Sequence, residues 1–210
     1  MTVAAPARVQ MHRALAPEDQ ARADFYALLA RLLRGAPDNA LLASIAAAGD
    51  FPAEGDPALA RAWNVLVSAA SVMDADAGSD EYHKVFEGVG AAEVSIYSAF
   101  YIGASAVDHP RVKLLGDLAD LGLARRETVT EPDDHWAALL DVMRVLVAGG
   151  AGRSAATVAE QRRFYQAHVE PGLAAFFKAT LAAPSANFYR KVADLGLAFE
   201  ALETEAFRLD

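Results

Sequence analysis

The sequence predicts an all-α fold, a single-domain bundle of roughly eight to ten helices over residues 17–210. Alanine and leucine, both strong helix formers, dominate an apolar fraction of 54%. The β-branched residues expected of sheets are few, and no alternation of apolar and polar residues continues beyond a few positions. Apolar residues instead recur at steps of three and four, which is the spacing of one helix face. A chain of 210 residues can enclose one substantial core.

Three helices are predicted in the first third of the chain. Pro17 stands where a first-turn proline belongs, and Gly35 ends the helix that it opens. A short helix is expected at residues 38–48, and Asp56 before a proline predicts a third helix that reaches about residue 73. The apolar stripe of the first helix consists of Ala21, Phe25, Leu28, Leu29, Leu32 and Leu33.

The middle of the chain is predicted to be less regular. Residues 74–80 are polar and are expected to be flexible, and a short helix is expected at residues 81–87 before a glycine turn at residues 88–90. Further helices are predicted at about residues 93–103 and 108–123.

The last third of the chain has the strongest helical signals. Residues 130–133 have the spacing of a capping box with aspartate in place of the usual glutamate, so Asp133 is the expected cap of a helix that ends at Gly149. Two further helices are predicted at residues 154–169 and 171–181. The final helix follows a proline, and its stripe consists of Phe188, Val192, Leu195, Phe199, Leu202 and Ala206.

Composition excludes several classes of protein and site. There is no cysteine, so disulfides, thiolate metal sites and cysteine nucleophiles are absent. The net charge of −9 argues against a nucleic-acid or anionic-membrane surface and favours a basic partner, although it could serve solubility alone. No apolar run reaches the ~18–20 residues of a membrane span. Residues 1–16 are expected to be a disordered lead-in without a signal-peptide core, and a cytoplasmic location is expected.

The sequence does not predict an enzyme. Asp80 and His83 have the spacing of a carboxylate–histidine pair, but this is one loose half of the ligand set of a di-iron bundle. A zinc-binding His-Glu-x-x-His motif, a phosphate-binding Walker loop and a Gly-x-Ser-x-Gly nucleophile elbow are all absent. We therefore expect no cofactor, no metal and no catalytic residue. The alternative is a metal- or nucleotide-dependent hydrolase that uses His83, His135 and nearby carboxylates.

Two segments are candidates for a binding surface. Four aromatic side chains of residues 82–101, those of Tyr82, Phe86, Tyr97 and Tyr101, flank the glycine turn and could line an apolar groove or simply pack two short helices together. Residues 131–136 open a helix with three carboxylates, a histidine and a tryptophan. The helix dipole stabilises acidic residues at this position, so capping alone could explain the aspartates, whereas His135 is not needed for capping.

These segments, in their order along the chain, resemble the TorD/DmsD family of cytoplasmic chaperones, which is related to the NarJ-type assembly chaperones. The resemblance covers about residues 18–207. Its most specific element is Glu-Pro-Asp-Asp-His at residues 131–135. The weaker elements are Phe25-Tyr26-Ala27-Leu28-Leu29, Leu32-Leu33, Tyr82 with Phe86, Ser95-Ile96-Tyr97 with Tyr101, Phe164 to Pro171, and Phe188-Tyr189.

The resemblance implies a chaperone that binds the twin-arginine signal peptide and the apo form of a molybdenum-cofactor oxidoreductase, delays its export and assists cofactor loading. By position, Asp134 and His135 match family residues implicated in peptide binding. Family members usually carry a bulky residue where this chain has Gly172, which leaves the role of the His168 segment open. The full set of peptide-binding residues that we predict is Tyr82, Phe86, Tyr97, Tyr101, Glu131, Pro132, Asp134, His135 and Trp136.

Simple energetics assign different roles to the two segments. An exposed arginine–carboxylate pair contributes only about 0–1 kcal/mol, whereas burying one leucine-sized side chain contributes about 1.5–3 kcal/mol. Micromolar affinity needs about 8 kcal/mol, so most of it must come from the aromatic segment, while the carboxylates select for arginine. We expect a monomer or a helix-swapped homodimer. A permanent structural subunit of an oxidoreductase is the other alternative.

Overall fold

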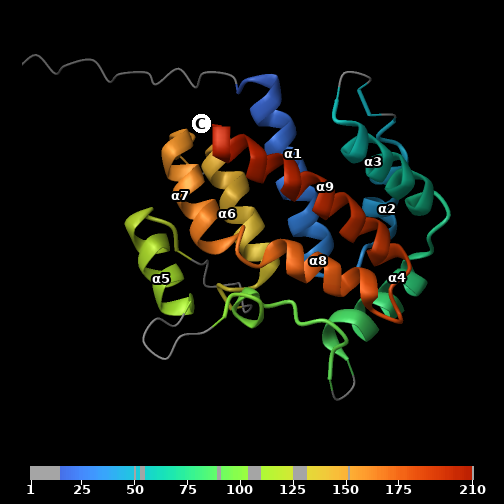
Figure 1. Ribbon diagram of the computed structural model, residues 1–210. Coiled ribbons are helices and arrows are strands. Elements are labelled where there is room, and N and C mark those ends of the chain that lie inside the picture. The colour runs from blue at the N-terminus through green and yellow to red at the C-terminus, as the bar shows by residue number, and fades with distance from the viewer. Residues whose placement is uncertain are drawn as a thin grey trace, which may run out of the picture.

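Nine α-helices form one bundle in the computed structural model, which describes residues 15–49, 51–52, 55–88, 91–103, 110–124, 132–150 and 152–209 (Figure 1). The only β pairing in these ranges is two isolated bridges, so the all-α prediction is confirmed. Apart from residues 15 and 16, the predicted lead-in falls outside the described part of the chain. The helices are α1 (Pro17–Arg34), α2 (Asn39–Ala46), α3 (Pro57–Ala70), α4 (Ala75–Tyr82), α5 (Pro110–Asp120), α6 (Trp136–Ala148), α7 (Val158–His168), α8 (Leu173–Ala182) and α9 (Phe188–Leu209).

Aspartate caps explain where three of these helices begin. Asp38, Asp56 and Asp74 precede α2, α3 and α4, and each carboxylate accepts a hydrogen bond from a backbone N–H of the first turn. Asp56 had been predicted in this role. Asp74 had not, and the prediction that residues 74–80 are flexible is wrong because its cap lets α4 form there, with Gly78 buried.

The beginning of α9 is capped from another helix. The Glu81 carboxylate, at the end of α4, accepts hydrogen bonds from the backbone N–H groups of Asn187, Phe188 and Tyr189 at 2.7, 3.0 and 2.7 Å. Three donors of the first turn are thereby satisfied by one buried side chain. After Tyr82 the chain continues as a π-helical turn, η1 (His83–Glu87), and leaves it at Gly88 with positive φ.

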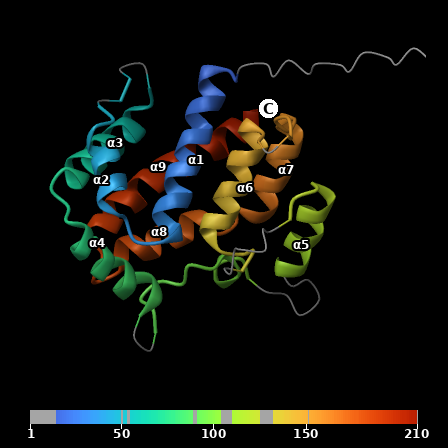
Figure 2. The ribbon, with the colours of Figure 1, turned by 180° about the vertical axis from the view of Figure 1, so that it is seen from behind.

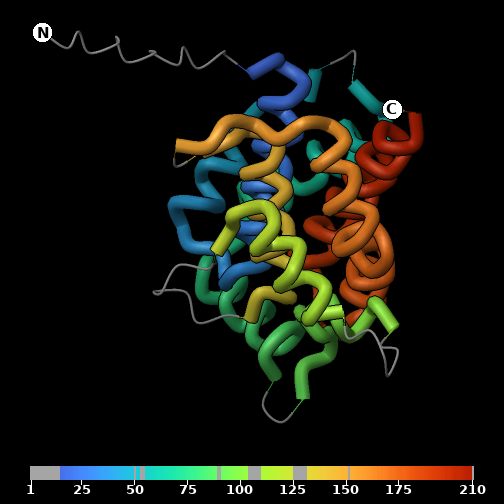
Figure 3. Tube along the Cα trace, turned by 90° about the vertical axis from the view of Figure 1, so that its left-hand side faces the viewer, coloured from blue at the N-terminus to red at the C-terminus, as the bar shows by residue number. Residues whose placement is uncertain are grey.

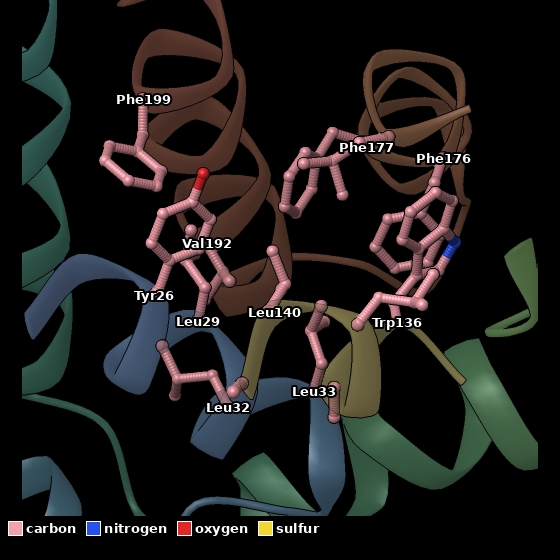
Figure 4. Packing of buried hydrophobic residues seen from close by; sticks show 14 of the residues in the cluster. Tyr26, Leu29, Leu32, Leu33, Trp136, Leu140, Phe176, Phe177, Val192 and Phe199 are labelled. Atoms are coloured by element: carbon pink, nitrogen blue, oxygen red, sulfur yellow. The ribbon is translucent and has the colours of Figure 1, made fainter. Parts of the chain in front are cut away.

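The core lies between α1, α6, α8 and α9. α1 and α6 pack side by side along their length, and α9 crosses on the other side of α1 against α3 and α8 (Figure 2). Side chains from all four helices point into the same interior (Figure 4). Those that the figure labels are Tyr26, Leu29, Leu32 and Leu33 of α1, Trp136 and Leu140 of α6, Phe176 and Phe177 of α8, and Val192 and Phe199 of α9.

Helix α5 lies on the surface of the bundle beside α7 (Figure 3). It buries Leu114 and Leu118 but leaves Val112 exposed. One polar contact joins the two helices, since the Nε2 atom of the buried His168 lies 2.6 Å from an Asp117 carboxylate oxygen. In the described part of the chain, no helix is both long and apolar enough to cross a bilayer.

Candidate functional site

A groove of about 700 Å³ opens between the residues that follow α4 and the beginning of α6. We call it the aromatic groove. Its walls come from five parts of the chain: the end of α1, the α4–η1 region, residues 92–101, the residue that precedes α6 and one residue of α8. Its lining consists of Arg34, Tyr82, Phe86, Glu87, Ala92, Glu93, Val94, Ser95, Ile96, Tyr97, Phe100, Tyr101, His135 and Ala179.

One wall of the aromatic groove is an extended segment that pairs with the start of α6. The N–H of Ser98 donates to the carbonyl of Asp134 at 2.8 Å, and the N–H of Trp136 donates to the carbonyl of Ile96 at 3.1 Å. Only a single 3₁₀ turn, η2 (Ser98–Phe100), forms here, so the prediction of a helix at residues 93–103 is wrong. These backbone hydrogen bonds to a distant segment replace the local ones that a helix would have made.

The floor of the groove comes from Tyr82 and Phe86, which are both buried. The Tyr82 hydroxyl donates to the carbonyl of Leu33 at 3.1 Å, which fixes the α4–η1 region against the end of α1. The Phe86 ring lies edge-on to Tyr189, with ring centroids 5.0 Å apart. Both residues therefore contribute to the core as well as to the groove.

The mouth of the groove carries exposed aromatic side chains. Phe100 is 74% exposed and Tyr97 is 40% exposed, although both are large apolar residues. Tyr101 is half-buried, and its hydroxyl donates to the Ser95 carbonyl at 2.8 Å. Burial raises the pKa of Tyr101 to about 12, so the hydroxyl stays protonated at neutral pH. A mouth of this kind offers apolar area that a partner could cover.

His135, rather than Asp133, caps α6. The helix begins at Trp136, five residues later than the capping-box pattern at residues 130–133 predicted, and the N–H of Ala137 donates to Nδ1 of His135 at 3.1 Å. The expectation that His135 has no capping role is therefore wrong, and so is the assignment of the cap to Asp133. The pairing of Trp136 with Ile96 places the first turn of α6 here. The Tyr97 ring stands edge-on over the imidazole, at 5.7 Å between centroids.

Asp134 lies next to the groove and is only 8% exposed. Within the described ranges its carboxylate makes no hydrogen bond and no ion pair, although its backbone carbonyl is paired. Its oxygens are not among the fully buried side-chain atoms that lack a hydrogen-bond partner, so the carboxylate keeps contact with solvent. Glu131 lies outside the described residues, and Pro132 is half-buried, with its carbonyl accepting from the N–H of His135.

Trp136 is fully buried and supports the groove from behind. Its indole contacts the rings of Tyr101 and Phe176, and its Nε1–H has no acceptor among the described residues. Gly172 lies against the same indole, and a Cβ there would stand 3.0 Å from the Cβ of Tyr101 and 3.3 Å from the Trp136 ring. The small residue that departs from the family pattern thus leaves room for the groove wall to pack closely.

Three charged side chains line the groove. The Glu93 carboxylate accepts hydrogen bonds from the hydroxyl and the N–H of Ser185, at 2.6 and 3.0 Å, and these bonds lower its pKa. Glu87 pairs with Nδ1 of His83. Arg34, in the last turn of α1, is the third, and its closest carboxylate is that of Asp141 at 3.8 Å.

Five of the nine predicted binding residues come together in this groove, from three separate segments of the chain. They are Tyr82, Phe86, Tyr97, Tyr101 and His135. Sequence reasoning missed Phe100, Arg34 and Glu93. Phe100 could have been found as a fifth aromatic in the same segment, whereas nothing local places Arg34 next to residues 60 positions away. His83 faces Glu87, and no three histidine, aspartate or glutamate side chains of the described ranges could together hold a metal ion.

Comparison with known proteins relates the chain to one family. The family model described as "Nitrate reductase delta subunit" matches residues 53–178, which are 126 of the 210 residues. The matched stretch includes both segments that pair across the groove, but not Arg34. No curated protein matches the chain. The match agrees with the resemblance to NarJ-type assembly chaperones that the sequence motifs indicate.

Proposed function

The chain belongs to the nitrate reductase delta subunit family, a family of molybdoenzyme assembly chaperones, and on this basis we propose that its aromatic groove binds the twin-arginine signal peptide of an apo-molybdoenzyme. The client is a nitrate reductase subunit or a related oxidoreductase subunit. Binding takes place in the cytoplasm, delays export and holds the client while its cofactor is loaded. The protein itself performs no chemical reaction in this proposal.

The observation that carries the proposal is the exposed aromatic mouth of the groove. Phe100 and Tyr97 leave apolar area in water at the mouth of a groove of about 700 Å³. Covering such side chains gives about 1.5–3 kcal/mol each, so a few of them, together with a client's apolar stretch, approach micromolar affinity. A signal peptide offers an apolar stretch of this kind.

Asp134 supports the arginine part of the proposal, because its carboxylate makes no hydrogen bond or ion pair among the described residues. A carboxylate that keeps contact with solvent can pair with a guanidinium, which offers two parallel N–H donors in a fixed geometry. Its backbone carbonyl accepts from the N–H of Ser98, which holds Asp134 beside the segment that lines the groove. The net charge of −9 adds a long-range attraction for a basic peptide.

Titration calorimetry with synthetic peptides tests the proposal. The probe is a twin-arginine peptide of about 25 residues, and the control peptide carries two glutamines in place of the two arginines. We expect Phe100→Ala to weaken binding about ten-fold, because one aromatic contact is lost. The matched control is Val72→Ala, which also truncates an exposed apolar side chain but lies after α3, outside the groove. Equal effects of the two substitutions, or no preference for arginine, would overturn the proposal.

Co-expression with the apo-client separates a chaperone from a permanent subunit. We expect the complex to persist on size-exclusion chromatography while the client lacks its cofactor and to dissociate after loading. A complex that survives loading would support the alternative of a structural subunit. Deleting the client's signal peptide should weaken the complex if the groove is its docking site.

A further inference from the structure

Arg34 is the only lysine or arginine among the residues that line the aromatic groove. It belongs to the last turn of α1, and its side chain is 47% exposed. Arginine side chains at a groove wall carry five N–H donors in a planar fork that matches a carboxylate. Arg34 is therefore the side chain at this wall that can bind a carboxylate of a ligand.

The guanidinium of Arg34 makes only a long contact with a carboxylate of the protein. Its nearest carboxylate oxygen, Oδ2 of Asp141, lies 3.8 Å away, which is too far for a hydrogen bond. The other oxygen of Asp141 is held by Nε of Arg144 at 2.6 Å. Among the described residues Arg34 makes no hydrogen bond, so its donors remain available to a bound molecule.

The two carboxylates that line the groove, in contrast, have close partners within the protein. Glu93 is held by two hydrogen bonds from Ser185, and Glu87 is paired with His83. The Ser185 donors are neutral and lower the pKa of Glu93, so this carboxylate keeps its charge, but its hydrogen bonds hold it away from Arg34. Beside these carboxylates the groove presents one cation whose N–H donors make no hydrogen bond among the described residues, and near it the arginines of a basic peptide would be repelled.

We propose that Arg34 binds an acidic side chain of the client peptide and so fixes the direction in which the peptide lies in the aromatic groove. The inference rests on the function proposed above. The aromatic mouth takes the peptide's apolar residues, the twin arginines lie away from Arg34, and a glutamate or aspartate of the peptide forms a bidentate pair with the guanidinium. Arg34 is thus a specificity-determining residue that distinguishes clients by the position of an acidic residue.

A glutamate scan of the probe peptide tests this inference. Fluorescein-labelled twin-arginine peptides of about 25 residues are made with glutamate, glutamine or lysine at each position in turn outside the arginine pair. Fluorescence anisotropy should find one or two neighbouring positions where glutamate binds roughly three- to five-fold tighter than glutamine, the effect of a half-exposed ion pair. This gain should shrink as salt is added.

Variants of two arginines on the same helix identify the responsible side chain. Arg34→Met keeps the apolar stem and should abolish the preference for glutamate at that position. Arg31→Met is the matched control, because Arg31 lies one turn earlier, is 42% exposed, pairs with Asp38 at 3.0 Å and does not line the groove. It should keep the full preference. Arg34→Glu should reverse the preference, so that lysine at the same position binds tighter than glutamate.

The outcomes separate this inference from the function on which it rests. If the wild-type protein binds none of the peptides, both are wrong. If it binds them with no preference for glutamate at any position, the groove binds peptides but the role proposed for Arg34 is wrong. The same conclusion follows if Arg34→Met keeps that preference. Circular dichroism of each variant checks that α1 still folds.

Discussion

The two ends of α1 hold polar side chains in contrasting states. Near its beginning, Arg22 donates to both oxygens of Glu203 in α9, at 2.7 and 2.9 Å, and the Tyr26 hydroxyl donates to the same carboxylate at 2.7 Å. Near its end lies Arg34, and the groove that Arg34 lines also contains the start of α6 with Asp134. Neither side chain makes a hydrogen bond to another described residue.

The comparison teaches which polar groups stabilise the fold and which remain available for binding. Glu203 is buried and every one of its oxygens is satisfied, so it ties α9 to α1. Asp134 is also only slightly exposed, but its side chain connects no two described helices. A carboxylate that contacts solvent and that no described residue holds remains available to a ligand.

The largest change in stability is expected when the hydrogen bonds at the beginning of α1 are removed. Glu203→Ala leaves the Arg22 guanidinium and the Tyr26 hydroxyl without their acceptor, so we expect the free energy of unfolding to fall by about 3 kcal/mol. Urea denaturation measures it, with Glu205→Ala, an exposed residue of the same helix, as the control. Peptide binding should not change. A loss below about 1 kcal/mol would mean that the pair contributes no more than a surface one.

A smaller effect is expected from crowding the groove wall. Gly172→Ala places a Cβ 3.0 Å from Cβ of Tyr101 and 3.1 Å from Cγ1 of Ile102, and contacts this short are rare. Overpacking of this kind costs about 1 kcal/mol or more. The backbone at Gly172 has an ordinary negative φ, so any loss comes from space and not from backbone strain. Gly116→Ala in the open middle of α5 is the control, and it should raise stability by about 0.5–1 kcal/mol. A stabilising Gly172→Ala would contradict the close fit.

His168 supplies a pH-dependent effect away from both ends of α1. Burial lowers its pKa below the ordinary 6.5, against the opposing effect of the Asp117 carboxylate. The folded state therefore binds a proton at His168 less readily than the unfolded state does. The free energy of unfolding is highest above pH 6.5, where the imidazole is neutral in both states, and it decreases as the pH falls through the lowered pKa. Urea midpoints at pH 8 and pH 5 should separate for the wild type more than for His168→Gln. The opposite order would mean that the pair with Asp117 outweighs burial.

The smallest effect on stability is expected at Asp134. Asp134→Asn removes a charge that no described residue pairs with and that solvent reaches, so the free energy of unfolding should stay within about 0.5 kcal/mol of the wild type. Binding of the twin-arginine peptide should nevertheless weaken several-fold. This combination is the reverse of the one expected for Glu203→Ala. A large loss of stability at Asp134 would place it among the structural residues instead.

Most of the helices could be predicted from the sequence, because their signals are local. The apolar spacing of α1 and α9, and the Asp56 cap of α3, depend on residues within a few turns of one another. The sequence motifs also predicted that the aromatic segment and the start of α6 form one surface, and five of the nine predicted residues line the same groove. Residue types and spacing were sufficient for these conclusions.

Only the tertiary structure decided how the groove is built. The segment around Tyr97 has enough apolar residues for a helix, but its backbone hydrogen bonds go to residues 134–136, about 38 positions away. The same pairing moves the start of α6 to Trp136 and makes His135 its cap. Arg34 reaches the groove solely because α1 packs along α6. Such long-range hydrogen bonds and packing override local preference, since a buried backbone group must find a partner wherever the fold supplies one.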